Sequence, residues 1–282
     1  AMGEGTYAYI DASSVANNNG AVGTDEIVVG ILHKPATVSV NEAPRVLYSS
    51  NSPSDDEGVL FVDTKNRPSL AQQFIHLASG ETFVVNVNHF KSKGSSCGTG
   101  DDDYETGQGN CNKTRTRAAT AVATWLEAEY PDTPVILLGD LNSYAKEDPI
   151  TVLNDYGYSD AAATVIGELA YSYTFDGQLG TLDYLMTNAL ASEWLFDATE
   201  WHINADEPAV LDYNTEDNGD LFTNSLLYRA SDHDPVIATF TMPSETMAGD
   251  WDSDGDIDMI DLQRLSMAIA SNQDMDDSFD LN

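Results

Sequence analysis

A short apolar run at residues 135–138 leads into the tetrapeptide Gly-Asp-Leu-Asn at 139–142. The run is bounded by Pro134 and a glycine, a pattern typical of a buried strand. Side chains alternate along an extended chain, so Asp140 and Asn142 should point to the same side. A carboxylate beside an amide, which both donates and accepts hydrogen bonds, suits the positioning of a water molecule or a metal-bound oxygen. The alternative is a polar turn that merely follows a strand.

Three further polar sites stand beside short predicted strands. Taken singly, each has a simple structural explanation, such as a surface imidazole or a carboxylate paired with a nearby base. Taken together with the first site, they supply what hydrolysis of a phosphodiester requires: a carboxylate for a divalent metal, groups that orient water, an imidazole held by a carboxylate, and a second imidazole. The three sites are His89, Asp183, and the adjacent pair Asp232 and His233.

Five of the 12 basic residues fall in one segment that follows His89. One interpretation is a loop that contacts the phosphate groups of a substrate, and the alternative is a loop that happens to be basic. The first interpretation assigns Lys91, Lys93, Arg115 and Arg117 to substrate phosphate. Lys113 completes the segment.

The formal net charge of −35 results from 47 acidic residues. Such a charge disfavours a polyanionic partner, because it repels phosphate. An acidic surface is tolerated at high salt, where the screening length falls to about 3 Å at 1 M. We therefore interpret the charge as adaptation to a saline, extracellular medium. No run approaches the roughly 18 apolar residues of a membrane span.

Cys97 and Cys111 are the only cysteines, and they lie in a loop rich in Gly, Ser, Asn and Asp. A pair alone in a polar loop favours a disulfide, which would contribute about 3 kcal/mol in the chain-entropy model. The predicted disulfide indicates an oxidising compartment. A zinc site is disfavoured, because no cluster of histidines lies at metal-binding spacing.

The elements that must position these residues are mainly strands. Apolar runs and turn signals predict a hairpin, several single strands and two helices, with turn-rich segments at 41–65 and 201–217. This mixture favours a sandwich of sheets flanked by helices. The predicted strands are 25–34, 70–77, 82–88, 135–138, 171–175, 181–186 and 236–240, and the predicted helices are 114–130 and 149–156.

Several local strings carry a resemblance to a known family. Residues 86–94, the two-cysteine loop, and residues 114–117, 175–178 and 201–208 resemble bacterial secreted deoxyribonucleases of the endonuclease/exonuclease/phosphatase superfamily. The similarity covers most of residues 4–242. It implies an α/β fold, a four-layer α/β/β/α sandwich, and cleavage dependent on Mg²⁺ or Mn²⁺.

The resemblance also implies roles for individual residues. Asp140 and Asn142 would position the attacking water and the phosphate. Asp183 would orient His233, which would act as a base or stabilise the developing charge. His89 would face the scissile phosphate and could protonate the leaving oxygen. The remaining assignment is Asp232, which would hold the Mg²⁺.

One departure from the family concerns the start of the chain. Family members begin with a strand that carries an Asn and continue to a strand that carries a metal-binding Glu, and neither occurs before Gly5. We therefore expect a domain at 1–242 that is N-terminally truncated by one strand–helix–strand unit. The exposed sheet edge would invite a dimer, and the catalytic metal would be bound weakly.

The C-terminal residues fit the calcium loop D-x-D-x-D-G with an acid at position 12. The pattern resembles a dockerin repeat, and residues 280–282 look like the opening of a second repeat. The resemblance implies Ca²⁺ binding and a cohesin-like partner, with 243–249 as a linker and 250–282 as the tail. The predicted calcium ligands are Asp250, Asp252, Asp254, Asp256 and Asp261.

The sequence thus predicts a secreted metal-dependent phosphodiester hydrolase, a nonspecific extracellular endonuclease acting on DNA, or on RNA. Two alternatives stay open. The substrate of the same fold could be a phospholipid or a sugar phosphate, or the chain could be an inactive calcium-dependent interaction module, because fold alone does not decide function.

Overall fold

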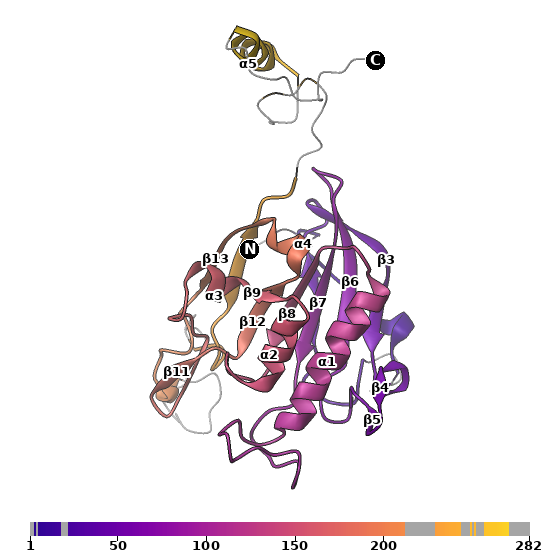
Figure 1. Cartoon of the computed structure of the whole chain (residues 1–282), viewed down its shortest axis with the longest axis vertical. Helices are drawn as coiled ribbons and strands as arrows, with labels where there is room; N and C mark the ends of the chain where they lie inside the picture. Colours follow the sequence, from indigo (N-terminus) through magenta and orange to yellow (C-terminus); the bar gives the residue numbers. More distant parts are fainter. Residues whose placement is uncertain are drawn as a thin grey trace.

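A computed structural model describes residues 3, 5–17, 22–211, 229–243, 249, 251 and 257–270. A mixed six-stranded sheet in the order β3-β6-β7-β8-β12-β9 forms its centre (Figure 1). The sheet is antiparallel except between β7 and β8, which are parallel and connected through α1. The strands are β3 Val38–Leu47, β6 Ser69–His76, β7 Thr82–His89, β8 Val135–Asp140, β12 Asp183–Thr187 and β9 Ser159–Asp160.

Two helices, α1 (Asn112–Glu129) and α2 (Asp148–Asp155), cover one face of this sheet (Figure 1). The buried face of α1 carries Trp125 and Leu126, which share a core with Leu137 of β8. Both helices lie where the sequence predicts them. Pro149 stands in the first turn of α2, where its fixed backbone angle is favourable and its missing N–H costs nothing.

A second core fills the opposite face of the sheet and includes Phe74, Ile136 and Trp194. Strands β13 (Leu195–Glu200) and β14 (Val236–Phe240) form a separate antiparallel pair beside this core. The α/β sandwich class is therefore as predicted. The other elements are β1 Ala8–Tyr9, β2 Leu32–His33, β4 Ser54–Asp55, β5 Gly58–Val59, β10 Tyr173–Phe175, β11 Gln178–Gly180, α3 Ala161–Val165, α4 Ala189–Ser192 and α5 Met259–Ala270.

Two predictions about the N-terminal part are wrong. The predicted buried strand at 25–34 contributes only β2, and Ile27 and Val28 are more than half exposed. The predicted loop at 41–65 begins inside β3, which pairs with β6 along the edge of the sheet. The register of β3 shifts between Asn41 and Arg45, and such a bulge breaks the alternation by which a strand is identified in sequence.

Strands β7 and β8 end, and β12 begins, at the same end of the sheet. In the parallel pair, His89 at the end of β7 is the cross-strand partner of Asp140 at the end of β8. In the neighbouring antiparallel pair, Asp183 at the start of β12 is also the partner of Asp140. The fold therefore delivers an imidazole and two carboxylates to adjacent positions.

Close contact between β7 and β8 depends on Gly139. Its backbone has a φ of +126°, and a Cβ atom at this position would lie 1.9 Å from the backbone oxygen of Asn88. Only glycine adopts this conformation and leaves room for the neighbouring strand.

None of the helices in the described part of the chain is long and apolar enough to cross a membrane. The predicted linker is described only in part. Four of the five predicted calcium ligands, Asp250, Asp252, Asp254 and Asp256, and the predicted second loop at 280–282 lie outside the described residues.

Candidate active site

The candidate site is centred on Asp140 of β8, the strand that lies between β7 and β12. His89 Nε2 lies 3.4 Å from Asp140 Oδ2. The ligand atoms of Asp140, Asp183 and His233 all lie within 4.8 Å of one another. Two strands and the segment before β14 thus bring together residues that are far apart in the sequence, as predicted.

Asn142 joins this group for a different reason from the one predicted from strand alternation. Its backbone has a φ of +49°, so the chain turns after β8 instead of continuing as a strand. The Asn142 backbone N–H donates to Asp140 Oδ1 at 2.8 Å, and its side-chain amide donates to Asp140 Oδ2 at 3.0 Å. The amide also donates to the Phe90 carbonyl at 3.0 Å, which ties the turn to the end of β7.

His233 and Asp183 form the predicted hydrogen-bonded pair. His233 Nδ1 lies 2.6 Å from Asp183 Oδ2. The Ser172 hydroxyl donates to the same carboxylate oxygen at 2.8 Å and accepts the Asp183 backbone N–H at 3.0 Å. The Asp183 carboxylate is therefore fixed from two sides, and it fixes the orientation of the imidazole.

The charges of the site shift several pKa values. Burial, followed by the charge of Asp183, raises the pKa of Asp140 to about 6. Burial alone would lower the pKa of His233, but its hydrogen bond to Asp183 and the charges of Asp183, Asp140 and Asp232 raise that pKa to about 9. Burial and the charges of Arg67 and His233 lower the pKa of His89 to about 4. At neutral pH one imidazole is charged and the other is neutral.

The pKa of His233 leads to a prediction about stability. Because the folded pKa of about 9 lies above the ordinary value of 6.5, the pairing stabilises the fold fully below pH 6.5 and is lost as the pH rises through 9. In EDTA, His233→Gln should therefore lower the free energy of unfolding by about 3 kcal/mol more at pH 6 than at pH 9.5. Urea titrations at both pH values measure this difference. A cost that does not change with pH would contradict the ion pair.

The donor set fits a divalent cation. Two carboxylates that face each other carry an excess of negative charge, which a cation would relieve, and Mg²⁺ commonly uses one or two carboxylates together with substrate phosphate. Asp140 and Asp183 would supply the oxygen ligands, while His233, which is charged at neutral pH, would stand beside the cation without ligating it. Asp232 does not belong to this group of ligand atoms, so its role as a Mg²⁺ ligand stays a prediction.

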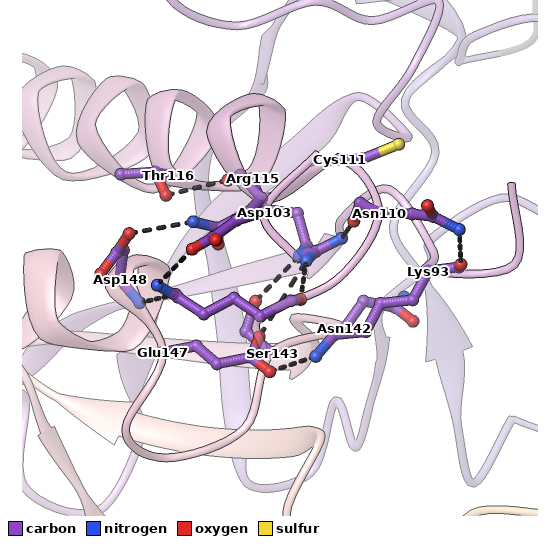
Figure 2. Close-up of polar contacts among 12 residues, drawn as sticks. Lys93, Asp103, Asn110, Cys111, Arg115, Thr116, Asn142, Ser143, Glu147 and Asp148 are labelled. Atoms are coloured by element: carbon purple, nitrogen blue, oxygen red, sulfur yellow. Dashed lines mark hydrogen bonds and ion pairs between the residues drawn. The ribbon is translucent and has the colours of Figure 1, made fainter. Parts of the chain in front are cut away.

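The structure corrects the assignment of Arg115 to substrate phosphate. Its side chain is 0% exposed. The guanidinium donates to the Ser143 hydroxyl at 3.1 Å and to the Asn110 carbonyl at 2.7 Å (Figure 2). It also donates to the carbonyls of Lys91 at 3.2 Å and Gln108 at 3.3 Å. A guanidinium that is buried and satisfied in this way joins the loops that follow β7 and β8, and it does not contact a substrate.

A prediction follows for Arg115→Met. The substitution removes the donors from several buried acceptors, and each acceptor left unsatisfied costs roughly 1–3 kcal/mol. We expect the free energy of unfolding to fall by about 3 kcal/mol or more, measured by urea titration. The matched control is Arg117→Met on the same helix, where the ion pair with Asp55 (2.6 Å) should be worth about 1 kcal/mol at most. Equal losses in the two variants would contradict this role.

The other basic residues of the segment differ in their environments. Arg117 binds both oxygens of Asp55 and the carbonyls of Gly58 and Val59, and its assignment to substrate phosphate stays a prediction. Lys93 forms an ion pair with Glu147. The ammonium group of Lys91 hydrogen-bonds to the hydroxyls of Ser92 (3.3 Å) and Ser95 (3.1 Å) and forms no ion pair within the described residues. Its role in binding phosphate stays a prediction.

The sequence analysis missed Arg67 as a base beside the site. Its backbone N–H donates to the His89 carbonyl at 3.1 Å. Burial lowers the pKa values of His89 and Lys91, and the charge of Arg67 lowers them further. The rise that burial causes in the pKa of Asp140 is partly offset by the same charge of Arg67. The side chain pairs with Asp25 at 3.2 Å, and its buried Nε has no hydrogen-bond partner among the described residues. Arg67 precedes Pro68 in a loop, so no local pattern indicated its position.

The sequence analysis also missed the buried carboxylate of Asp234. It accepts the backbone N–H groups of Ile203, Asn204 and Ala205 at 2.8–3.2 Å, and the imidazole of His202 lies 2.9 Å away. The side-chain amide of Asn204 donates to the His233 carbonyl at 2.8 Å. This network fixes the backbone that carries His233. An adjacent Asp-His-Asp string was the only available signal.

The predicted disulfide between Cys97 and Cys111 is present, with an S–S distance of 2.11 Å. The loop that it closes is held internally by Asp102, whose carboxylate accepts the backbone N–H groups of both cysteines at 2.9 and 2.7 Å. The carbonyls that receive Arg115 come from this loop and from the segment before it. The loop therefore supports the site without lining it.

The tail shows one predicted calcium ligand. Asp261 is buried, and its carboxylate accepts the backbone N–H groups of Trp251 at 2.5 Å and Asp258 at 2.6 Å. Helix α5 contains this residue. Calcium binding stays a prediction, because the other ligands are not described.

The fold and the site together define an α/β sandwich with a carboxylate–imidazole centre at the ends of the central strands of its main sheet. No protein-family model matches the sequence, and no curated protein matches it. A mannosyl-6-phosphatase of Bacteroides thetaiotaomicron VPI-5482 is similar in structure, with a TM-score of 0.52 and 14% identity over 84% of this chain and 78% of that chain.

Two other solved structures are similar at lower scores. One is an endonuclease/exonuclease/phosphatase family protein from Bacteroides thetaiotaomicron (TM-score 0.49, 14% identity, 82% of this chain and 74% of that chain). The other is TDP2 of D. rerio in complex with a single-strand DNA product (TM-score 0.45, 16% identity, 76% of this chain and 72% of that chain). At these identities the likeness shows the fold. The superfamily expected from the motifs and its deoxyribonuclease branch both stay predictions.

Proposed function

We propose that this chain is a metal-dependent hydrolase of phosphodiester bonds, and most specifically an extracellular DNA endonuclease of low sequence specificity. One observation carries the proposal: Asp140, Asp183 and His233 converge within 4.8 Å, with a second imidazole 3.4 Å from Asp140. This set combines a cation site with acid–base groups in different protonation states, as hydrolysis of a phosphoester requires.

The residues of the candidate site would have the following roles in hydrolysis. A bound divalent cation would supply charge stabilisation for the phosphoryl oxygens. Asp140 and the Asn142 amide are positioned to hold the attacking water and the phosphate. His233 is kept protonated by Asp183, so its free ring nitrogen can donate a hydrogen bond to the negative charge that develops on phosphate. The attacking water would pass its proton to Asp140, which is ionised at pH 7. His89 is neutral at pH 7, so its ring N–H would stabilise the leaving oxygen by a hydrogen bond without transferring a proton to it. Arg67 and Lys91 would attract the phosphate.

A phosphomonoesterase is the second candidate. The specific observation in its favour is the fold shared with a mannosyl-6-phosphatase, at a TM-score of 0.52. A nuclease must leave room for chain on both sides of the phosphate, whereas a phosphomonoesterase needs a closed pocket for one terminal phosphate. A phospholipase or an inactive interaction module remains the alternative if neither substrate reacts.

A paired assay tests these functions. Supercoiled plasmid and mannose 6-phosphate are incubated separately with the protein in Mg²⁺, Mn²⁺ or EDTA, and nicked DNA or released phosphate is measured. We expect nicking with a divalent cation, none in EDTA and none with Asp140→Asn. Release of phosphate without nicking would replace the nuclease by the phosphatase, and no reaction with either would reject both.

Secretion into a saline medium is part of the same proposal, supported by the disulfide and by the net charge of −35. Raising NaCl from 0.1 to 1 M shortens the screening length from about 10 to 3 Å and weakens the repulsion between an acidic protein and DNA. We therefore expect nicking to persist or increase at 1 M NaCl, measured as initial rates at fixed Mg²⁺. A fall in the nicking rate at 1 M NaCl, as expected for a nuclease that attracts DNA through a positively charged surface, would contradict adaptation to a saline medium.

Two interactions of the whole chain are also proposed. The calcium loop would bind a cohesin-like partner, and calorimetry of the unsubstituted protein and Asp250→Ala tests for Ca²⁺ uptake. The pair β13–β14 carries exposed Phe196 and Ile237, and the described residues place no further strand beside it. Pairing of such an edge would give a dimer, which sedimentation can detect.

A further inference from the structure

A short hairpin stands beside the site as a sheet of its own. Strands β10 and β11 pair with each other and with no other strand in the described part of the chain. The hairpin lies at the end of the main sheet where β8 ends (Figure 1). Alternate residues of a strand point to one face, so Tyr173 and Phe175 share a face of β10. Their rings are 6.4 Å apart and inclined by only 13°.

This aromatic face begins at the catalytic imidazole. The Tyr173 ring lies 4.6 Å from the His233 ring, and the backbones of the two residues are joined by an isolated bridge. From His233 the rings of Tyr173 and then Phe175 lead outward, and the Phe175 side chain is 58% exposed. The Tyr173 ring is tilted by 35° to the His233 ring, and beyond it the near-parallel rings of Tyr173 and Phe175 form an aromatic surface that starts at a group that would contact phosphate.

On the opposite strand, the residues paired with the two aromatic side chains are a glycine and a glutamine. Gly180 is the cross-strand partner of Tyr173, and Gln178 is the partner of Phe175. A Cβ atom at Gly180 would lie 2.5 Å from the ring of Tyr144, so the glycine allows that ring to border the same surface. Gln178 is exposed and adds an amide that can both donate and accept hydrogen bonds.

We propose that Tyr173, Phe175 and Gln178 form a subsite that stacks an unpaired nucleobase next to the scissile phosphate. The inference rests on the proposed function and narrows its substrate to nucleic acid with unpaired bases. A flat ring surface accepts the face of any base, and such stacking is sequence-tolerant. A base in a duplex is covered on both faces by its neighbours, so we expect preference for single strands.

Binding tests the subsite without requiring hydrolysis. A fluorescent oligothymidylate and a strand of the same length made of abasic sites are titrated with the protein in EDTA, and anisotropy is measured. Stacking contributes about 1–3 kcal/mol per base, so Phe175→Ala should weaken binding of oligothymidylate about 5- to 150-fold and leave binding of the abasic strand unchanged. Phe175→Trp should restore the affinity.

The hairpin also supplies a matched control. Leu179 is 60% exposed and pairs with Thr174, which places it on the opposite face, so Leu179→Ala should bind oligothymidylate normally. Equal losses in Phe175→Ala and Leu179→Ala, or equal losses on both strands, would overturn the subsite. If the protein hydrolyses no phosphoester but still shows the Phe175-dependent difference, the proposed function fails and the subsite stands.

Discussion

Asp183→Asn is expected to slow phosphodiester hydrolysis by about 10²–10⁴-fold, the usual contribution of positioned acid–base groups. Asp183 Oδ2 accepts hydrogen bonds from His233 Nδ1 at 2.6 Å and from the Ser172 hydroxyl at 2.8 Å. An amide lacks the charge that keeps His233 protonated, although its oxygen can still accept these two hydrogen bonds. The imidazole would then lose its proton at neutral pH, and with it the positive charge that would stabilise the developing negative charge on phosphate.

Initial rates of plasmid nicking in Mg²⁺ measure this effect. The matched control is Asp160→Asn, because Asp160 is also a carboxylate whose pKa burial raises to about 6, but it caps α3 by accepting the Ala162 N–H at 3.0 Å. The control should keep its activity, and circular dichroism should show that both variants are folded, although Asp183→Asn loses the ion pair with His233 and should be the less stable of the two below pH 9. A normal rate in Asp183→Asn would show that the protonated His233 is not needed for hydrolysis.

Gly139→Ala should have the largest effect on stability. The added Cβ atom would lie 1.9 Å from the Asn88 backbone oxygen, so β7 and β8 must separate at the centre of the sheet. We expect the free energy of unfolding to fall by about 4 kcal/mol or more, at the upper end of single substitutions, and activity to be lost because His89 and Asp140 no longer lie side by side.

Gly157→Ala is the control for backbone strain alone. Gly157 has a φ of +85° and no atom within 4 Å of its would-be Cβ, so alanine there should cost about 1–2 kcal/mol. Urea titrations of the two variants separate strain from steric overlap. If Gly139→Ala costs no more than Gly157→Ala, the parallel strands adjust more freely than their contact indicates.

The sequence predicted the central elements because their signals are local. The apolar run before Asp140, the hairpin that ends at His89 and the helix that contains Trp125 each carry a pattern set by a few neighbouring residues. Strand β3 was missed because its bulge breaks the alternation. The pairing of Asp183 with His233, which are 50 positions apart, came only from the family resemblance.

The basic residues show where local patterns stop being informative. Arg115 was predicted to contact substrate because it belongs to a basic segment that follows His89. Its burial depends on carbonyls at Lys91, Asn110 and Gln108 and on the hydroxyl of Ser143. Those partners come from loops that the tertiary structure folds over the helix. Arg67 shows the reverse case, since only the fold brings that loop residue beside His89.

Because the β10–β11 hairpin is a sheet of its own, its sequence can change during evolution without altering the central sheet. The hairpin shares no strand pairing with the central sheet, while His89, Asp140 and Asp183 of the candidate site stand on strands of that sheet. An exchange of residues 174–179 would change what lies next to the phosphate without moving Asp140 or Asp183, provided that Tyr173 still packs on His233. Loops on a rigid scaffold are the parts that tolerate replacement. A single ancestral catalytic centre could in this way acquire new substrates through changes in one hairpin.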